Sequence, residues 1–350
     1  MQERPFMFRE KGCVGMQDIY FEEKYGRLFE KIEKGIFQVF TFQHMYGTVK
    51  HSFIMREIPL PVHGETYYDL VTPYGYGGPQ ILHCEEGRKA ELVGAFEDAF
   101  QEYCTERRIV SEFIRFHPVL NNAEDFLACY DVAHVRDTVG TNLKDHDQPV
   151  EVEFSKSARK NIRQALKAGV EYRVTRNPSD LSEFKNIYYA TMERNHADTY
   201  YFFGDDYFDQ LIHLLGENVL LVEVLYEGRV IGAGLNFVYK NLAHTHLSGT
   251  LSEFNCFSPA SILNYGLTLW AKENGIDVIH GGGGRTNSAD DNLFVFKKQF
   301  GRQTAFKFYT GRKIWNSTVY QELCAGLDLQ EETEFFPAYR SKSMDLYERV

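Results

Sequence analysis

Glycine, lysine and aspartate residues gather in one stretch of this sequence, residues 278–301. A short β-type run leads into four consecutive glycines, 281–284, and then into polar turn residues and an amphipathic segment that contains Phe296 and Lys297 and ends at Gly301. Glycine has no Cβ, so its backbone can adopt φ > 0 or approach a ligand closely. The pattern predicts a strand, a glycine bed (residues 281–284) with a ligand against it, and a cationic helix. A flexible loop between core elements is the alternative.

The chemistry open to this stretch centres on Lys297. A fixed ammonium beside a glycine-rich approach is suited to stabilise an oxygen atom that gains negative charge during a reaction. The alternative is a surface lysine that pairs with Asp290 or Asp291, one or two helical turns away. Asp290, Asp291 and His280 are the candidates for removing a proton, and the sequence does not distinguish among them. Deprotonation assisted by the substrate itself is equally open.

Two aromatic segments are candidates for binding a substrate. Arg194, followed by Tyr201, is a possible clamp for a phosphate or carboxylate, because guanidinium donates two parallel hydrogen bonds and aromatic rings stack on flat groups. An ion pair with Glu193 or Asp198 is the alternative. Residues 72–79 form an aromatic loop that is rich in glycine and proline, which we expect to line an acceptor cleft between domains or to form a structural turn. The candidates for substrate binding are thus Arg194, Tyr201, Tyr74, Gly75, Tyr76, Gly282, Gly283 and Arg285.

A basic stripe stands out in an otherwise acidic chain. Residues 155–169 begin with a serine N-cap candidate and end at a glycine, as a helix does. Four cations recur at helical spacing on one face, namely Lys156, Lys160, Arg163 and Lys167. Such a stripe is either a solvated helix face or a site for a phosphate-bearing donor. We name these four residues the basic stripe.

Length and composition describe an ordinary globular protein with an excess of aromatic residues. The chain has 350 residues, 15% aromatic residues and a formal net charge of −11, which disfavours broad contact with DNA or an anionic membrane. The first six residues lack the pattern of a secretory signal, and no long apolar run indicates a membrane span. We therefore expect a cytoplasmic protein. Six scattered cysteines, without zinc-type spacing, are expected to be reduced thiols.

Hydrophobic periodicity predicts an α+β fold with at least two domains. Strands are expected near 35–43, 49–58, 111–117, 218–226, 229–239 and 242–249, with helices at 155–169, 181–191, 205–215 and 259–274. The dipeptide Glu227-Gly228 between two strands predicts a hairpin. The run 137–153 is interpreted as a domain boundary, because it is charged, contains proline and has little hydrophobic periodicity. His244 and His246 share one face of their strand, but no acidic or thiol partner stands nearby, so we expect no metal.

The order helix, helix, three antiparallel strands, helix, strand, helix, strand resembles the acetyltransferase (GNAT) fold. Several motifs in order resemble its Fem-type branch: Ser155-Lys-x-x-Arg159-x-Asn-Ile-Arg163, Thr191-Met-x-Arg194, Tyr201-Phe-Phe, Phe296-Lys297-x-x-Phe300-Gly301 and Tyr74-Gly-Tyr-Gly-Gly-Pro79. The resemblance implies two tandem GNAT-like domains, each a mixed, largely antiparallel sheet flanked by helices. It places them at 1–150 and 151–312, with 313–350 packing back on the first domain. It also implies nonribosomal transfer of amino acids to peptidoglycan precursors, with Phe296 and Lys297 at the acyl-transfer site. Asp291, one of the candidate bases named above, completes our catalytic set.

Two departures from the family pattern bear on the acyl donor. No heptad-rich helical arm interrupts the second domain, and the usual coenzyme A signature is missing after the central strand, where Gly249-Thr-Leu-Ser-Glu follows instead. The standard backbone cradle for a pyrophosphate is therefore not expected. The donor is aminoacyl-tRNA or acyl-CoA as a co-substrate, with no tightly bound cofactor, and the acceptor is a small or nucleotide-linked amine.

Three hypotheses follow from the sequence. The first is transfer of an aminoacyl or acyl group to an amino group of a cell-envelope or polysaccharide precursor, with tRNA suggested by the basic stripe. The second is a CoA-dependent N-acetyltransferase, which the acidic net charge favours because that charge opposes tRNA. The third is a non-catalytic binding module that keeps the aromatic cleft.

Overall fold

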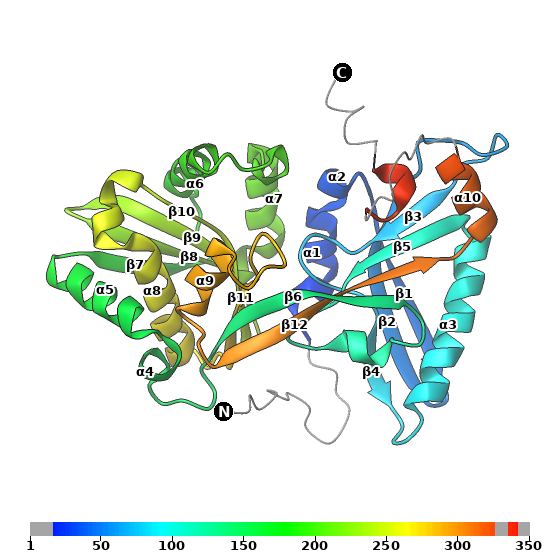
Figure 1. The fold of residues 1–350 in the computed structure, drawn as a ribbon, viewed down its shortest axis with the longest axis horizontal. Coiled ribbons are helices and arrows are strands. Elements are labelled where there is room, and N and C mark those ends of the chain that lie inside the picture. Colours follow the sequence, from blue (N-terminus) through cyan, green and yellow to red (C-terminus); the bar gives the residue numbers. More distant parts are fainter. Residues whose placement is uncertain (1–16, 326–334, 342–350) are drawn as a thin grey trace. The chain divides into compact units, whose positions relative to one another are not determined.

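The computed structural model describes residues 17–325 and 335–341. Contacts among the described residues divide them into two units: an N-terminal unit, residues 17–135 with 307–325 and 335–341, and a central unit, Arg136–Phe306. The chain crosses from one unit to the other within strand β6 (Asp131–Asn142) and again within β12 (Thr304–Ile314) (Figure 1). The predicted domains at 1–150, 151–312 and 313–350 stay a prediction. No helix among the described residues has the length and apolarity to cross a bilayer.

The N-terminal unit is a mixed sheet with helices packed on it. Antiparallel pairing joins β1 to β2, β2 to β3 and β4, and β5 to the end of β12, while β3 and β5 run parallel. Its elements are α1 (Glu23–Leu28), α2 (Glu30–Glu33), β1 (Gly35–His44), β2 (Gly47–Glu57), β3 (Tyr68–Val71), β4 (Gln80–Cys84), α3 (Lys89–Glu106), β5 (Ile109–Arg115) and α10 (Ser317–Ala325), with short 3₁₀ turns at Ile19–Phe21, Asn122–Asp125 and Ala338–Arg340.

Helix α3 anchors the core of this unit. Leu92, Phe96 and Phe100 follow one another at four-residue intervals, which places them on one helical face, and all three are fully buried. The described part of the C-terminal segment also belongs to this unit. The Tyr339 hydroxyl donates to Asp69 at 3.1 Å. Residues 326–334 and 342–350 lie outside the described residues, so packing of the whole segment stays a prediction, and Cys13 also lies outside them.

The central unit has a larger sheet in the order β6-β11-β10-β9-β8-β7. Only β10 and β11 pair in parallel; the other neighbours are antiparallel, which confirms the predicted α+β class. Its elements are α4 (Pro149–Glu153), α5 (Lys156–Lys167), β7 (Glu171–Arg176), α6 (Ser182–Arg194), α7 (Asp205–Leu215), β8 (Val219–Tyr226), β9 (Arg229–Tyr239), β10 (Leu242–Thr250), α8 (Pro259–Glu273), β11 (Val278–Gly282) and α9 (Asn292–Lys298), with 3₁₀ turns at Thr199–Tyr201, Gly216–Asn218 and Ser252–Phe257.

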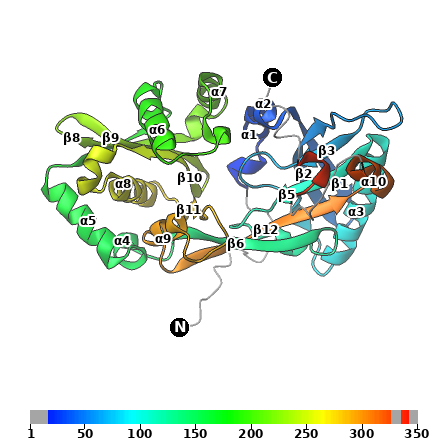
Figure 2. The same cartoon turned by 45° about the horizontal axis from the view of Figure 1, so that its top comes forward.

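Helices cover both faces of the central sheet. Alternate residues of β8, including Leu220 and Val222, share a core with Ile162 of α5 and Leu267 of α8. On the other face α6 packs against β9 and β10 (Figure 2). A strand buried on both faces needs apolar residues at successive positions, and β8 is buried from Val219 to Val224. The continuous apolar run of β8 is explained by this double cover.

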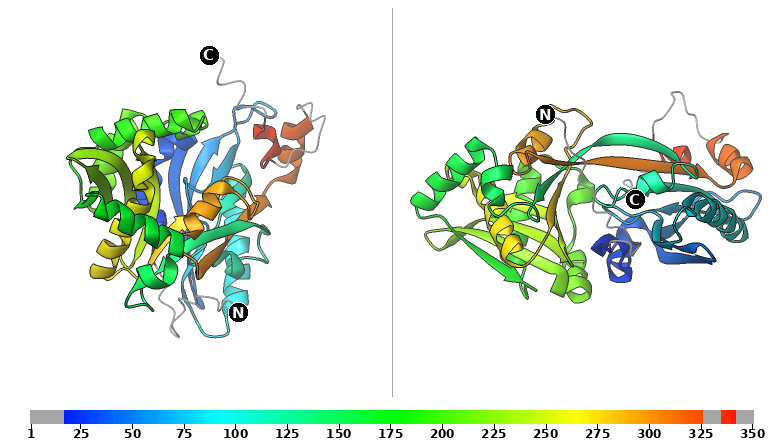
Figure 3. Two further views of the ribbon diagram at one scale, coloured as in Figure 1. Left: turned by 60° about the vertical axis from the view of Figure 1, so that its left-hand side comes forward. Right: turned by 90° about the horizontal axis from the view of Figure 1, so that it is seen from below.

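Residues 137–153, which have little hydrophobic periodicity, nevertheless contain regular structure. Strand β6 extends to Asn142, and α4 covers Pro149–Glu153. Thr138 of β6 donates to the carbonyl of Phe306 at 3.2 Å, so the end of β6 lies beside the start of β12 (Figure 3). Glu153 is fully buried and accepts the backbone N–H of Gln303 at 2.9 Å. The run is ordered because distant partners satisfy its polar groups, which apolar periodicity does not report.

Gly301 permits the close approach of the end of α9 to β6. A Cβ built on Gly301 would lie 1.9 Å from the carbonyl oxygen of Gly140, a backbone atom that cannot rotate away. We expect Gly301→Ala to lower the free energy of unfolding by about 3 kcal/mol, at the upper end of the cost of overpacking. Urea unfolding followed by circular dichroism measures this. Gly204→Ala, with no atom within 4 Å of the added Cβ, is the control and should change stability by less than about 0.5 kcal/mol.

Candidate active site

The glycine bed begins as the end of strand β11. Parallel pairing of β10 with β11 covers only Leu242–Val278 through His244–His280. On its other side β11 pairs with β6, and the register shifts between His280 and Gly282, which indicates a bulge at Gly281. Gly282 has φ +73°, a conformation that L side chains rarely adopt. The bulge and the left-handed residue together turn the chain out of the sheet.

Asp291 closes the loop that follows the glycine bed. One carboxylate oxygen accepts the N–H groups of Leu293 and Phe294 at 2.9 and 3.0 Å and so caps α9. The other oxygen accepts the N–H groups of Arg285 and Thr286 at 3.0 and 2.9 Å, and the Thr286 hydroxyl at 3.1 Å. Hydrogen bonds from Phe294, Thr286 and Arg285 lower the pKa of Asp291 to about 2. A carboxylate with five donors is a poor proton acceptor, so its geometry favours positioning.

The protein's own side chains fill the space that two of the glycines leave. A Cβ on Gly284 would lie 2.4 Å from Oδ1 of Asp291, and a Cβ on Gly283 would lie 2.9 Å from Cδ of Arg136. These two glycines therefore admit Asp291 and Arg136 to the backbone. The predicted contact of Gly282 and Gly283 with a substrate stays a prediction, and Arg285 has an exposed side chain next to them.

Lys297 returns from α9 to the glycine bed. Its ammonium donates to the carbonyl oxygen of Gly283 at 2.9 Å, and the side chain is partly buried. Burial lowers the pKa of Lys297 to about 8; Arg136 lowers it further, while Asp291 acts in the opposite direction. The head group thus lies against the bed and not in bulk solvent. A lysine whose pKa lies near physiological pH can exist in both protonation states there.

Arg136 is the neighbour of this site that the sequence did not reveal. Its Nη1 donates to the carbonyl oxygen of Gly284 at 2.6 Å across 148 residues of sequence. Lys297 and Arg136 therefore hold the carbonyls of two successive glycines. No motif or local pattern points to Arg136, which directly precedes the polar run 137–153 that we interpreted as a boundary. Only the pairing of β6 with β11 brings it to the bed.

Aromatic packing connects the end of α9 to the start of the basic helix α5. Phe296 is partly buried and packs edge-to-face on Phe300, with ring centroids 5.2 Å apart, and Phe300 packs in the same way on Phe154. The N–H of Ser155 donates to the carbonyl of Gln299 at 2.7 Å. Ser155 also caps α5, accepting the N–H of Ala158 at 3.0 Å, as predicted. Helix α5 therefore begins where α9 ends.

The basic stripe is exposed along α5. Within the described residues, none of its four members, Lys156, Lys160, Arg163 and Lys167, makes an ion pair, whereas Arg159 between them pairs with Glu151 at 2.8 Å. Arg163 also lines an open hollow of about 380 Å³ whose apolar wall includes Ile162, Leu166 and Leu269. Unpaired exposed cations keep their full charge for a polyanion. Donor binding by the stripe stays a prediction.

Arg194 and Tyr201 lie apart from the glycine bed in sequence and in their contacts. The Arg194 guanidinium donates to the carbonyl of Thr250 at 2.9 Å, at the end of β10. The Tyr201 ring is 40% exposed, and its carbonyl accepts the hydroxyl of Tyr188 at 2.6 Å. The structure thus holds the aromatic turn between α6 and α7 in a fixed conformation. No contact among the described residues joins either side chain to Lys297 or Asp291.

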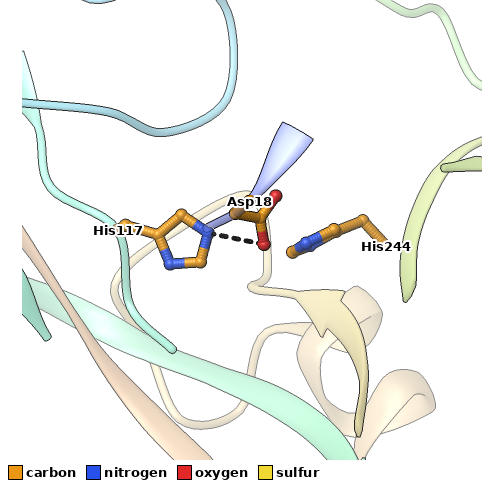
Figure 4. Close-up of side chains that lie close together, drawn as sticks. All are labelled: Asp18, His117 and His244. Atoms are coloured by element: carbon orange, nitrogen blue, oxygen red, sulfur yellow. Dashed lines mark ion pairs between the residues drawn. The ribbon is translucent and has the colours of Figure 1, made fainter. Parts of the chain in front are cut away.

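The second aromatic loop belongs to the N-terminal unit. The carbonyl of Tyr74 accepts the hydroxyl of Tyr25 at 2.7 Å, and Gly75 has φ +91°. The Tyr76 ring contacts the His117 ring, with centroids 5.7 Å apart. His117 is fully buried and pairs with fully buried Asp18 at 3.3 Å (Figure 4). These contacts fix the loop, and its predicted role in acceptor binding stays open to experiment.

The remaining candidate bases and the two histidines of β10 lie in different surroundings. His280 is buried and hydrogen bonds to the hydroxyl of Thr138 at 2.9 Å, whereas Asp290 is exposed. The His244 ring packs against His280, with centroids 5.5 Å apart. His246 hydrogen bonds to the hydroxyl of Tyr207 at 2.6 Å, and burial lowers the pKa of His246 to about 3. The described cysteines, 84, 104, 129, 256 and 324, are free thiols.

Asp291 should be needed for the order of the glycine loop. In Asp291→Asn an amide NH₂ faces backbone donors that the carboxylate accepts, so we expect faster amide hydrogen exchange across residues 285–294. Asp290→Asn, which changes an exposed neighbour, is the matched control. The pKa of Asp291 is lowered to about 2 in the folded protein. The stabilisation of the fold by this carboxylate is therefore fully present above the pKa that the same carboxyl has in the unfolded chain, and it is lost as pH falls through about 2. Equal exchange in both variants would contradict the role of Asp291.

Comparisons with known proteins place this geometry in a family. Residues 153–328, slightly more than half of the chain, match the family described as acetyltransferase (GNAT) domain. A curated relative, the UDP-N-acetylmuramoylpentapeptide-lysine N(6)-alanyltransferase of Weissella viridescens, is 25% identical over 173 residues, which are 49% of this chain and 50% of the relative. The aligned part therefore spans about half the length of that relative.

Two solved structures share the fold at low sequence identity. The crystal structure of FemX covers 87% of this chain and 94% of its own, with a TM-score of 0.67 and 15% identity. The second structure is the C-terminal domain of a protein from Agrobacterium fabrum that is assigned as a lysylphosphatidylglycerol synthetase. The match covers 90% of this chain and 93% of that domain, with a TM-score of 0.55 and 11% identity. The chain belongs to the acetyltransferase (GNAT) domain family, and its resemblance to the Fem-type branch is confirmed.

Proposed function

We propose that the protein transfers an aminoacyl group from the ester of an aminoacyl-tRNA to an amino group of a nucleotide-linked precursor of the cell envelope. The observation that carries the proposal is the ammonium of Lys297, partly buried and held 2.9 Å from the Gly283 carbonyl. The named activity of the Weissella relative, an alanyltransferase acting on a lysine, supports this class of reaction. Both co-substrates are made in the cytoplasm, which is where we place the reaction.

The reaction needs a fixed positive charge more than a strong base. The acceptor nitrogen attacks the ester carbonyl, a C–N bond forms and the ester C–O bond breaks. The proton that the nitrogen loses ends on the leaving hydroxyl, so the substrates themselves supply the proton balance. One N–H of the Lys297 ammonium is used by Gly283, and the others remain for the oxygen that becomes negative. Asp291 serves by holding the loop and α9, and Phe296 by packing α9 on Phe300.

The binding roles are proposed from residue chemistry. Exposed cations without ion-pair partners suit the phosphates of tRNA, so we assign the donor to the basic stripe on α5. Within the central unit, the acceptor is assigned to Arg194, Tyr201, Gly282, Gly283 and Arg285. In the N-terminal unit, Tyr74, Gly75 and Tyr76 are proposed as substrate-binding residues of their own loop. No tightly bound cofactor takes part in this scheme.

An acetyl-CoA-dependent N-acetyltransferase is the second candidate. The match of residues 153–328 to the acetyltransferase (GNAT) domain family favours it. Lys297 would serve either donor in the same way, because a thioester and an ester both develop negative charge on the carbonyl oxygen. The donor therefore has to be decided by experiment.

Removal of the Lys297 ammonium should slow transfer. We expect Lys297→Met to lower kcat by about 10²–10³-fold, the usual cost of one oxyanion donor. Its neighbour offers the matched control: Lys298 is exposed and contacts the Phe294 ring from 5.8 Å, and Lys298→Met should keep kcat within about twofold. Single-turnover transfer of a radiolabelled aminoacyl group measures both. Equal rates in the two variants would remove Lys297 from the mechanism.

The same lysine predicts a pH dependence. The pKa of Lys297 is lowered to about 8, so the wild-type protein loses its cation as pH rises through that value, whereas Lys297→Met has none to lose. The ratio of wild-type to variant rates should therefore fall above about pH 8. Taking the ratio cancels the ionisation of the acceptor amine. If the ratio rises with pH instead, the neutral amine of Lys297 is the active form.

The donor can be identified by salt dependence together with the basic stripe. We expect transfer from aminoacyl-tRNA, with an affinity that falls steeply with added salt through release of counterions. The double variant Lys160→Gln/Arg163→Gln should weaken tRNA binding and lower the salt slope by about 2. Lys24→Gln, an exposed lysine of α1, should leave the slope unchanged. Transfer from acetyl-CoA alone would select the second candidate, and retained ligand binding without transfer from either donor would indicate a binding module.

A further inference from the structure

Arg136 has a free edge beside the proposed reaction site. Its Nη1 donates to Gly284, while its Nε is buried and has no hydrogen-bond partner in the described part of the chain. In a guanidinium group, Nη1 lies next to Cδ, and the N–H bonds of Nε and Nη2 point the same way on the opposite edge. This edge is the planar fork that recognises a carboxylate through two parallel hydrogen bonds. The Gly284 carbonyl thus leaves the recognition edge of Arg136 unused.

The position of this fork is fixed by the glycine bed. The Arg136 stem lies where a side chain at Gly283 would be, since an added Cβ would approach Cδ of Arg136 to 2.9 Å. The carbonyl of the same residue, Gly283, accepts the ammonium of Lys297. Arg136 and Lys297 therefore contact one glycine from two elements, β6 and α9. The fork therefore belongs to a side chain that lies against the same glycine as the proposed catalytic lysine.

We propose that Arg136 is a substrate-binding residue that takes a carboxylate of the acceptor through Nε and Nη2, beside Lys297. The acceptor class is thus an amine that also carries a carboxylate, as lysine with a free α-carboxylate does. This inference rests on the proposed acyl transfer at the same site. A buried N–H without a partner is costly, and a carboxylate oxygen would satisfy it with a charge-assisted hydrogen bond.

Binding of a carboxylate also changes the charges around Lys297. The groups that act on its ammonium are Asp291 from the loop and Arg136 from β6, and Arg136 lowers the pKa of Lys297. A carboxylate on the fork offsets the charge of Arg136, so the acceptor raises the pKa of Lys297 and favours the ammonium form. The substrate would thereby help to keep the cation that the transfer step uses.

Equilibrium binding of two small probes tests the inference without any acyl donor. The probes are Nα-acetyl-L-lysine and its C-terminal amide, which differ in the carboxylate alone, and NMR titration of the intact protein gives both dissociation constants. We expect wild-type protein to bind the carboxylate at least about tenfold more tightly, as for a charge-assisted hydrogen bond. Arg136→Met should reduce the ratio of the two dissociation constants, amide over carboxylate, to about one. Arg302→Met, which removes an exposed arginine just after α9, should keep it.

Two further measurements make the test decisive. Gly283→Ala displaces the Arg136 stem without removing its charge and should also reduce the ratio, which guards against misfolding of Arg136→Met. Competitive acetylation of Lys297 with acetic anhydride, followed by mass spectrometry over a pH series, should show a higher midpoint with the carboxylate probe than with the amide. A phosphonate probe that binds while the carboxylate binds no better than the amide would overturn the assignment.

The outcomes separate this inference from the proposed function. A wild-type ratio near one, or a ratio unchanged in Arg136→Met, overturns the carboxylate site whether or not the protein transfers acyl groups. A ratio that depends on Arg136 supports the site even if neither aminoacyl-tRNA nor acetyl-CoA serves as donor. In that case the proposed function fails and the binding site stands.

Discussion

The carboxylate of Asp291 is the interaction on which the candidate site depends. Its two oxygens accept five hydrogen bonds, three from the loop after the glycines and two from the first turn of α9. A single group therefore fixes the direction in which the chain leaves the sheet and the point at which the helix begins. Lys297 lies near the end of that short helix, so its ammonium reaches the Gly283 carbonyl only if both are set. A change in the conformation of this loop would move the Lys297 ammonium.

Two cations on consecutive carbonyls give the site its electrostatic character. Arg136 donates to the Gly284 carbonyl, and Lys297 donates to the Gly283 carbonyl. Burial and the like charge of Arg136 both lower the pKa of Lys297. Such crowding of cations is unfavourable in the free protein, and perturbed lysines of this kind occur preferentially at functional sites. An anionic substrate group or a developing oxyanion relieves the repulsion. Burial is the largest cause of the lowered pKa of Lys297, Arg136 adds to it, and the same arrangement would favour a negatively charged group.

Much of the fold follows from local patterns in the sequence. Alternating and helical periodicities predicted β9, β10, α5 and α8. The predicted Ser155 cap is confirmed. The predicted hairpin is confirmed too, and its turn residues Glu227 and Gly228 both have φ > 0. Periodicity gave no signal between 137 and 153, where the end of β6 and the short helix α4 mix polar and apolar residues. Their order depends on partners such as Gln303, which donates to buried Glu153 across 150 residues of sequence. A local window carries no signal for such a bond.

The candidate site divides in the same way. The sequence by itself determined that a glycine run, a cap and a lysine follow one strand, because these features are encoded by neighbouring residues and by their spacing along one helix turn. Only the tertiary structure decided that Asp291 is saturated with hydrogen bonds and that Arg136 joins Lys297 at the bed. The physical reason is that pairing of β6 with β11 brings together residues separated by 148 positions, and the register of that pairing is set by the whole sheet.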